Sequence, residues 1–138
     1  MDIAKKTGKV KFPCRINLNA EGIKDFSLVF SNDIGEELII GYDKKQNQYF
    51  IDRTKSGKTD FQKEFAARHV SPRLAVNSKM NISLVIDISS IELFADDGLT
   101  VMTEIFFPNK PYNQINIRSA ENVLIKKLEY MNLKSTRR

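Results

Sequence analysis

Apolar side chains recur at every second position along most of this sequence. The alternation is clearest in residues 26–30, 38–42, 49–51, 82–88, 91–95 and 101–105, with a shorter run at 115–117. A period of two places successive side chains on opposite faces of a strand, so each run predicts a strand with one buried face. Residues 123–133 have some helical spacing, but their alternation favours a closing strand, whereas residues 60–70 could form a helical turn.

Short polar segments separate these runs and have the composition of turns. Residues 32–35 and 44–47 have hairpin length, Asp96-Asp97-Gly98 suits a type I′ hairpin turn, and residues 108–111 contain two prolines that would end a strand. Roughly nine to twelve short strands joined in this way predict an all-β fold, a two-sheet antiparallel β-sandwich. The 138 residues fit a single domain, residues 1–138, whose boundary is least clear over residues 1–20.

The composition narrows the classes of function. With one cysteine, Cys14, and one histidine, His69, no internal disulfide can form, and we expect neither a metal nor a cofactor. Cys14 lies in an apolar run and is predicted to be a buried thiol. No apolar run approaches the roughly 20 residues of a membrane-spanning helix. The net charge of +5 lies mainly near the two ends, without exposed aromatics among the basic residues, so we expect no nucleic-acid partner.

The N-terminal residues do not form a signal-peptide pattern. A complete chain of this kind would be expected in the cytoplasm. A module taken from a longer protein could equally come from a secreted, periplasmic or cell-surface enzyme, so the sequence leaves the compartment open.

Two segments carry a recognisable pattern of residues. The first, within residues 81–108, comprises Asp87, Ser89, Ser90, Glu92, Leu93, Phe94, Asp97, Gly98, Thr103, Phe107 and Pro108. The second, within residues 49–57, contains Asp52-Arg53 followed by Ser56-Gly57. Together they resemble the C-terminal β-sandwich module of glycoside hydrolase family 32, which includes levanases, inulinases, invertases and sucrose-6-phosphate hydrolases. The resemblance extends from about residue 26 to residue 130.

The resemblance implies a concanavalin A-like jelly roll that follows an N-terminal, catalytic five-bladed propeller. The motifs that hold the propeller's catalytic carboxylates are missing from this chain. It has no Trp, its Ser71-Pro72-Arg73 stretch is in the wrong order, and Cys14 does not follow a Glu. We therefore expect no catalytic residue here. The expected partner is the propeller of the same protein, with a fructan or sucrose-type carbohydrate as a further candidate.

Four residues are candidates for sugar binding or for structural polar contacts: Asp52, Arg53, Glu92 and Tyr49. Asp52 and Arg53 are adjacent on a predicted strand and must point to opposite faces, which favours separate structural partners. Glu92, if buried, would need a partner such as Arg73 or Arg53.

Aromatic side chains could stack on a sugar ring, but on strands they are more often packed in the core. We expect core positions for four of them: Tyr42, Tyr49, Tyr112 and Phe50. Asp96 and Asp97 fit a turn better than they fit the paired carboxylates of a glycosidase. His69 has no partner visible in the sequence and is predicted on a loop or at the surface.

Two functions follow from these observations. The first is a non-catalytic module that stabilises the catalytic domain of a β-fructosidase acting on levan, inulin or sucrose, and it predicts an exposed apolar patch where the two domains meet. The alternative is a stand-alone carbohydrate-binding module, which predicts a groove with exposed aromatic side chains.

Overall fold

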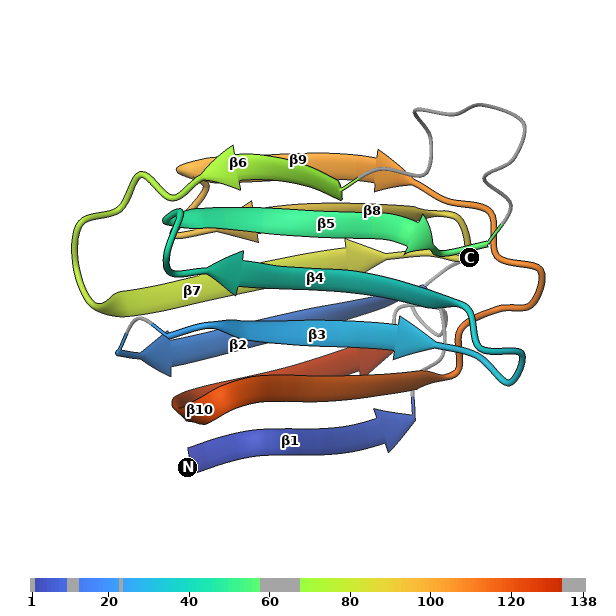
Figure 1. The fold of residues 1–138 in the computed structure, drawn as a ribbon, viewed down its shortest axis with the longest axis horizontal. Helices are drawn as coiled ribbons and strands as arrows, with labels where there is room; N and C mark the ends of the chain where they lie inside the picture. Colours follow the sequence, from blue (N-terminus) through green and yellow to red (C-terminus); the bar gives the residue numbers. More distant parts are fainter. Residues whose placement is uncertain (1, 10–12, 23, 58–67, 133–138) are drawn as a thin grey trace.

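The computed structural model describes residues 2–9, 13–22, 24–57 and 68–132, and within these ranges the chain forms ten β-strands (Figure 1). The strands are β1 (Asp2–Lys9), β2 (Cys14–Glu21), β3 (Phe26–Ser31), β4 (Glu37–Asp43), β5 (Gln48–Lys55), β6 (Arg68–Pro72), β7 (Lys79–Ile86), β8 (Ser90–Ala95), β9 (Thr100–Ile105) and β10 (Gln114–Asn132). The same residues include no helix, and hence none with the length and hydropathy that a membrane crossing requires.

The strands form two layers that lie one behind the other (Figure 1). One layer has the strand order β6-β5-β4-β3-β10, and the other has the order β10-β2-β7-β8-β9. Every strand pair is antiparallel. The prediction of an all-β, two-sheet antiparallel sandwich is confirmed.

Strand β10 belongs to both layers and closes one side of the sandwich. Its residues 114–118 pair with β3, whereas residues 124–132 pair with β2, with a bulge between Ile125 and Lys127. β1 pairs along the opposite side of β10. The two runs expected at 115–117 and 123–133 are therefore one 19-residue strand, because the chain passes from one layer to the other without a turn.

Residues 60–67 of the segment expected as a possible helical turn lie outside the described ranges. The residues that follow them form strand β6, which pairs with β5. The predicted hairpins connect β3 to β4, β4 to β5 and β8 to β9. Gly35 in the first has a φ of 83° and Asn47 in the second a φ of 52°, the left-handed conformation that these turns require.

The core lies between the layers and contains Tyr42, Tyr49 and Tyr112, as expected. Phe50 does not join them, so that expectation is wrong. It alternates with Tyr49 and Ile51 and therefore faces outward, where its ring lies over Gly41 and under the guanidinium of Arg68, 4.1 Å from the ring centroid. The missing side chain at Gly41 makes room for this ring.

Cys14 is fully buried in the core, as predicted. Burial raises the pKa of its thiol to about 12, and the nearby charge of Asp87 acts in the same direction. The protonated thiol is a poor nucleophile, and the surrounding core excludes reagents.

We expect Cys14 to react with iodoacetamide only when the protein unfolds. At about pH 8 the alkylation of Cys14 in the native protein should be on the order of 1,000-fold slower than in urea. The reason is that the thiol becomes exposed and able to ionise only when the protein unfolds. Mass spectrometry of timed samples measures both rates. Similar rates in the two conditions would show that Cys14 is accessible in the folded chain.

Candidate functional site

Strands β6 and β9 meet on the side of the sandwich away from β10 (Figure 1). They are the two ends of the strand order, so each leaves one backbone edge without a strand partner among the described residues. We call this side the closing edge and define it as β6, β9 and the adjoining residues 73–78 and 96–99. Unpaired strand edges in natural proteins are usually protected or covered.

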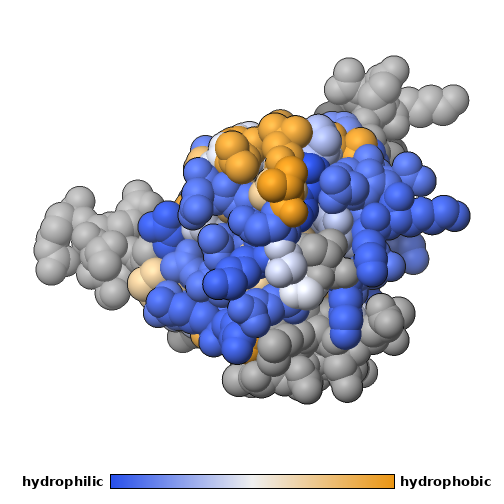
Figure 2. Space-filling view, turned by 90° about the vertical axis from the view of Figure 1, so that its left-hand side faces the viewer, coloured by the Kyte–Doolittle hydropathy of each residue, from blue (hydrophilic) through white to orange (hydrophobic). Residues whose placement is uncertain are grey.

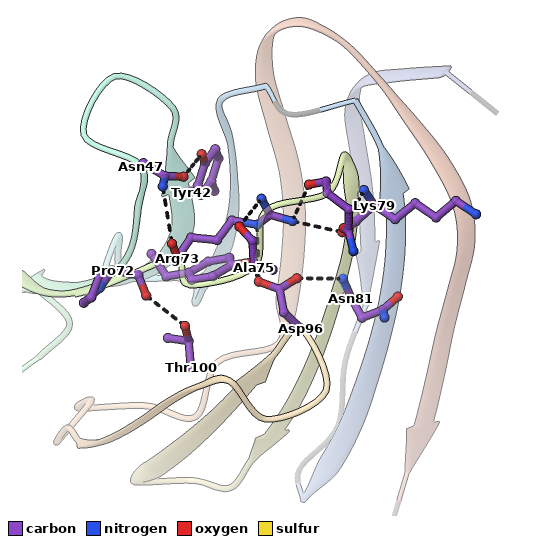
Figure 3. A network of polar contacts seen from close by, with 11 residues as sticks. Tyr42, Asn47, Pro72, Arg73, Ala75, Lys79, Asn81, Asp96 and Thr100 are labelled. Atoms are coloured by element: carbon purple, nitrogen blue, oxygen red, sulfur yellow. Dashed lines mark hydrogen bonds and ion pairs between the residues drawn. The ribbon is translucent and has the colours of Figure 1, made fainter.

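A buried ion pair ties the two layers together beneath the closing edge. Arg73 Nε lies 3.2 Å from Asp96 Oδ2, and Figure 3 shows the two side chains pointing toward each other. Tyr49 Oη donates a 2.6 Å hydrogen bond to the same carboxylate oxygen. The guanidinium also donates to three backbone carbonyls, those of Ala75, Asn77 and Lys79. The buried charge of Arg73 is therefore compensated on two sides.

The surroundings keep Tyr49 protonated. Burial raises the pKa of its hydroxyl, and the hydrogen bond to Asp96 and that group's negative charge act in the same direction, while Arg73 opposes them. A protonated hydroxyl can donate, and this matches its contact with the Asp96 carboxylate.

Further hydrogen bonds join the loops around this pair (Figure 3). Tyr42 Oη donates to Asn47 Oδ1 at 2.6 Å, and Asn47 Nδ2 donates to the backbone oxygen of Arg73 at 3.3 Å. Thr100 Oγ1 donates to the backbone oxygen of Pro72 at 2.8 Å, which links β9 to β6 directly. The two strands of the closing edge are thus held at a fixed separation.

A second polar cluster lies farther along the same edge. Glu104 Oε1 on β9 is 3.4 Å from Arg53 Nε on β5 and 2.8 Å from His69 Nδ1 on β6. Arg53 Nη1 also donates to the backbone oxygen of Ile105 at 2.8 Å. His69 lies at the surface, as predicted, with 44% of its side chain exposed, but on strand β6 and not on a loop. Its partner was not visible in the sequence, because only the antiparallel pairing of β5 and β6 brings it beside a carboxylate distant in sequence.

The four candidate residues from the sequence do not converge on one site. Tyr49 and Arg53 point inward and belong to the two separate clusters, with exposures of 0% and 5% that leave no path for a sugar. Asp52 faces outward, opposite to Arg53 as expected, and accepts hydrogen bonds from the backbone and hydroxyl of Thr54. Glu92 is exposed and has neither arginine as its partner. A sugar contact at Asp52 or Glu92 stays a prediction.

Sequence reasoning missed the two carboxylates that organise the closing edge. Asp96 was assigned only to a turn, yet its side chain is buried against Arg73. The hairpin is also wider than expected, because residues 96–99 separate the paired Ala95 and Thr100 and three of these residues have φ between 55° and 89°. No local sequence pattern indicated the role of Glu104, because its partners His69 and Arg53 lie 35 and 51 positions earlier in the chain.

Exposed hydrophobic side chains lie along the closing edge, among exposed polar residues such as Asn77 and Thr103. Five large hydrophobic side chains on it are each 49% to 58% exposed, and Val76 is fully exposed: Val70, Leu74, Leu99, Val101 and Ile105 are the five. Figure 2 views the molecule from the left-hand side of Figure 1. Hydrophobic surface lies at the top of this view, the side on which Figure 1 places β6 and β9, and most of the face below it is hydrophilic. The strand register places Val70 on the outer face of one layer and Val101 on the outer face of the other, so the exposed hydrophobic side chains flank the closing edge on both sides. The docking hypothesis predicts exposed apolar side chains of this kind.

Residues 2–132 match the protein family described as "Glycosyl hydrolases family 32 C terminal". The chain belongs to this family. Among curated relatives, it is 32% identical to the levanase of Bacillus subtilis over 69% of this chain and 14% of the levanase. It is 36% identical to the extracellular exo-inulinase of Aspergillus niger over 57% of this chain and 15% of that protein. The chain therefore corresponds to a C-terminal family 32 module and spans only a small part of these relatives.

Solved structures of family 32 enzymes share the fold. The exo-inulinase of Aspergillus awamori superposes with a TM-score of 0.80 at 22% identity, over 95% of this chain and 28% of that one. The fructofuranosidase of Schwanniomyces occidentalis complexed with fructose gives a TM-score of 0.69 at 20% identity, over 89% of this chain and 31% of that one. At these identities the likeness concerns the sandwich fold.

The Arg73–Asp96 pair predicts a large difference between two adjacent hairpin residues. Asp96→Asn should destabilise the chain by about 3 kcal/mol, because it leaves the buried guanidinium without its countercharge. Asp97→Asn should change the stability by less than about 0.5 kcal/mol, because Asp97 is exposed and both residues tolerate positive φ. Urea titration followed by circular dichroism measures both. Equal effects would contradict the importance of the pair.

Proposed function

We propose that this module docks through its closing edge onto the catalytic domain of a β-fructosidase and stabilises that domain. The observation that carries the proposal is that five large hydrophobic side chains on the closing edge remain about half exposed. A module that functions with no partner would gain nothing from leaving these groups in water.

The energetics favour such docking. Covering the exposed half of a Val, Leu or Ile side chain contributes about 1 kcal/mol, so the five together contribute about 5 kcal/mol. If the two domains share a polypeptide, the linker raises their effective concentration and reduces the entropic cost of association. An interface of this size can then persist without tight intrinsic affinity.

The interior of the closing edge supports the same role. Contacts made by Arg73 with Asp96, and by Glu104 with Arg53, fix the positions of β6 and β9 before any partner arrives. A rigid surface loses little conformational entropy on binding. The polar groups beneath the edge are directed inward, so docking does not require them to lose their partners.

The chemistry of the proposed enzyme follows from the relatives. The relatives matched include levanases, exo-inulinases and a sucrose-6-phosphate hydrolase, of which this chain covers 8% to 16%. We infer that the hydrolysis of fructosyl bonds is performed by a separate catalytic domain, the five-bladed propeller implied by the family resemblance. In this proposal the present module contributes stability and position.

The test uses the complete polypeptide that carries this module. Val101→Ser with Ile105→Ser should shorten the half-life of levan or inulin hydrolysis during heating by about tenfold, because the interface loses about 1–2 kcal/mol. Ile34→Ser is the matched control, since Ile34 is 50% exposed at the β3–β4 hairpin, away from the closing edge. Urea titration of the isolated variants should show near-native stability. An unchanged half-life in the double variant would refute the docking surface.

A further inference from the structure

The outer face of the β10-β2-β7-β8 layer carries a hollow with a volume of about 570 Å³. It lies on the surface, on the far side of this layer from the core, and it borders the closing edge at Asp97 and Gly98. The residues that line it include Asn17, Asn19, Asn81, Ser83, Phe94, Lys127 and Glu129. We call it the outer groove.

Strand register aligns these side chains in two rows. Glu129, Asn17, Ser83 and Phe94 are successive cross-strand partners on β10, β2, β7 and β8. Lys127, Asn19 and Asn81 form the second row, two residues away along each strand. Neighbouring strands lie about 4.8 Å apart, so the first row extends across about 15 Å of the sheet.

The first row is held in place by its own contacts. Ser83 Oγ donates to Asn17 Oδ1 at 2.8 Å, and Asn17 Nδ2 donates to Glu129 Oε1 at 3.5 Å. Lys127 Nζ lies 3.6 Å from Glu129 Oε2. These contacts orient the polar groups of the row without burying them.

The second row leaves its amides available. Within the described part of the chain, the half-buried side-chain amides of Asn19 and Asn81 have no hydrogen-bond partner. The backbone of Asn81 is nevertheless fixed, because Asp96 N donates to Asn81 O at 2.7 Å and Asn81 N donates to Asp96 Oδ1 at 3.4 Å. Figure 3 shows the Asn81 side chain extending away from Asp96 and Arg73. A rigid strand thus presents an unpaired amide to the groove.

This combination of groups matches a neutral sugar. Each asparagine amide offers two donors and one acceptor oxygen, which suits neighbouring hydroxyl groups. Phe94, half-buried at the end of the first row, offers an apolar surface for the C–H face of a sugar ring. The carboxylates of Glu129 and Asp97 offset the charge of Lys127, so the groove favours neither a polyanion nor a polycation.

We propose that the outer groove binds a neutral oligosaccharide. The assignment of that oligosaccharide to the fructan class rests on the proposed function above. Phe94 pairs with Val101, which lies on the closing edge, so a chain held in the groove would end beside the docked catalytic domain. The module would then hold the polymer close to the enzyme that cleaves it.

The test is a titration of the 138-residue chain with inulin-type oligosaccharides and with levan oligosaccharides, followed by calorimetry and by NMR of the side-chain amides. We expect millimolar binding and shifts of the Asn19 and Asn81 amide signals. Asn81→Ala should weaken binding about fivefold, as expected for the loss of one or two hydrogen bonds. Phe94→Ala should weaken it about tenfold through the loss of the ring surface.

Matched controls separate the groove from the rest of the surface. Gln46→Ala removes an exposed amide at the β4–β5 turn, and Ile34→Ala removes an exposed apolar side chain at the β3–β4 hairpin; both should bind like the parent chain. If Phe94→Ala fails to fold, Asn19→Ala and Asn81→Ala still test the groove, because both amides lie on the outer face without a partner in the described residues.

Two results would overturn the inference: no heat and no shift up to about 10 mM oligosaccharide, or binding that the groove variants leave unchanged. Equal affinity for cello-oligosaccharides would overturn the fructan assignment. The docking proposal is tested by the thermal half-life of the complete enzyme, which this titration does not measure. The two proposals can therefore fail independently.

Discussion

The Arg73–Asp96 pair is the interaction on which the arrangement of the sandwich edge depends. It connects the loop after β6, in one layer, to the hairpin after β8, in the other, and Tyr49 joins it from β5. Two charges taken from water are costly, and this cost is offset by hydrogen bonds from the pair to three backbone carbonyls and from the Tyr49 hydroxyl to Asp96. Its main effect is to fix the relative position of the two layers at this edge, which hydrophobic packing alone would not determine.

The fold could be predicted because its signal is local. Alternation in residues 26–30 or 82–88 needs only neighbouring positions to reveal a strand, and the Asp97-Gly98 pair needs only its own conformational preference to indicate a hairpin. The long β10 was divided in two because its bend comes from a change of partner strand, which no local pattern contains. Phe50 was assigned to the core for a different reason: its aromatic character was given more weight than its alternation with Tyr49 and Ile51, which already places it on the outer face.

The candidate site could be predicted only in part, because its contacts are formed between residues far apart in sequence. Opposite orientation of Asp52 and Arg53 followed from strand geometry and is confirmed. The partner of Arg53 did not follow, since Glu104 reaches it only when β9 closes on β5 and β6. The exposure of Val101 and Ile105 did not follow either, since the alternation in residues 101–105 predicts that they lie on the buried face of their strand. The structure instead buries the opposite face, with Thr100 and Met102.

The β8–β9 hairpin contributes residues to the buried Arg73–Asp96 pair, to the outer groove and to the closing edge. Its four residues lie between the paired Ala95 and Thr100 and turn through three left-handed positions, so successive side chains point in different directions. Asp96 enters the core beside Arg73, Asp97 borders the outer groove, and Leu99 stands on the closing edge. A two-residue turn could not separate these directions. The wider hairpin is therefore the feature that places the stabilising ion pair, the proposed docking surface and the proposed sugar groove side by side.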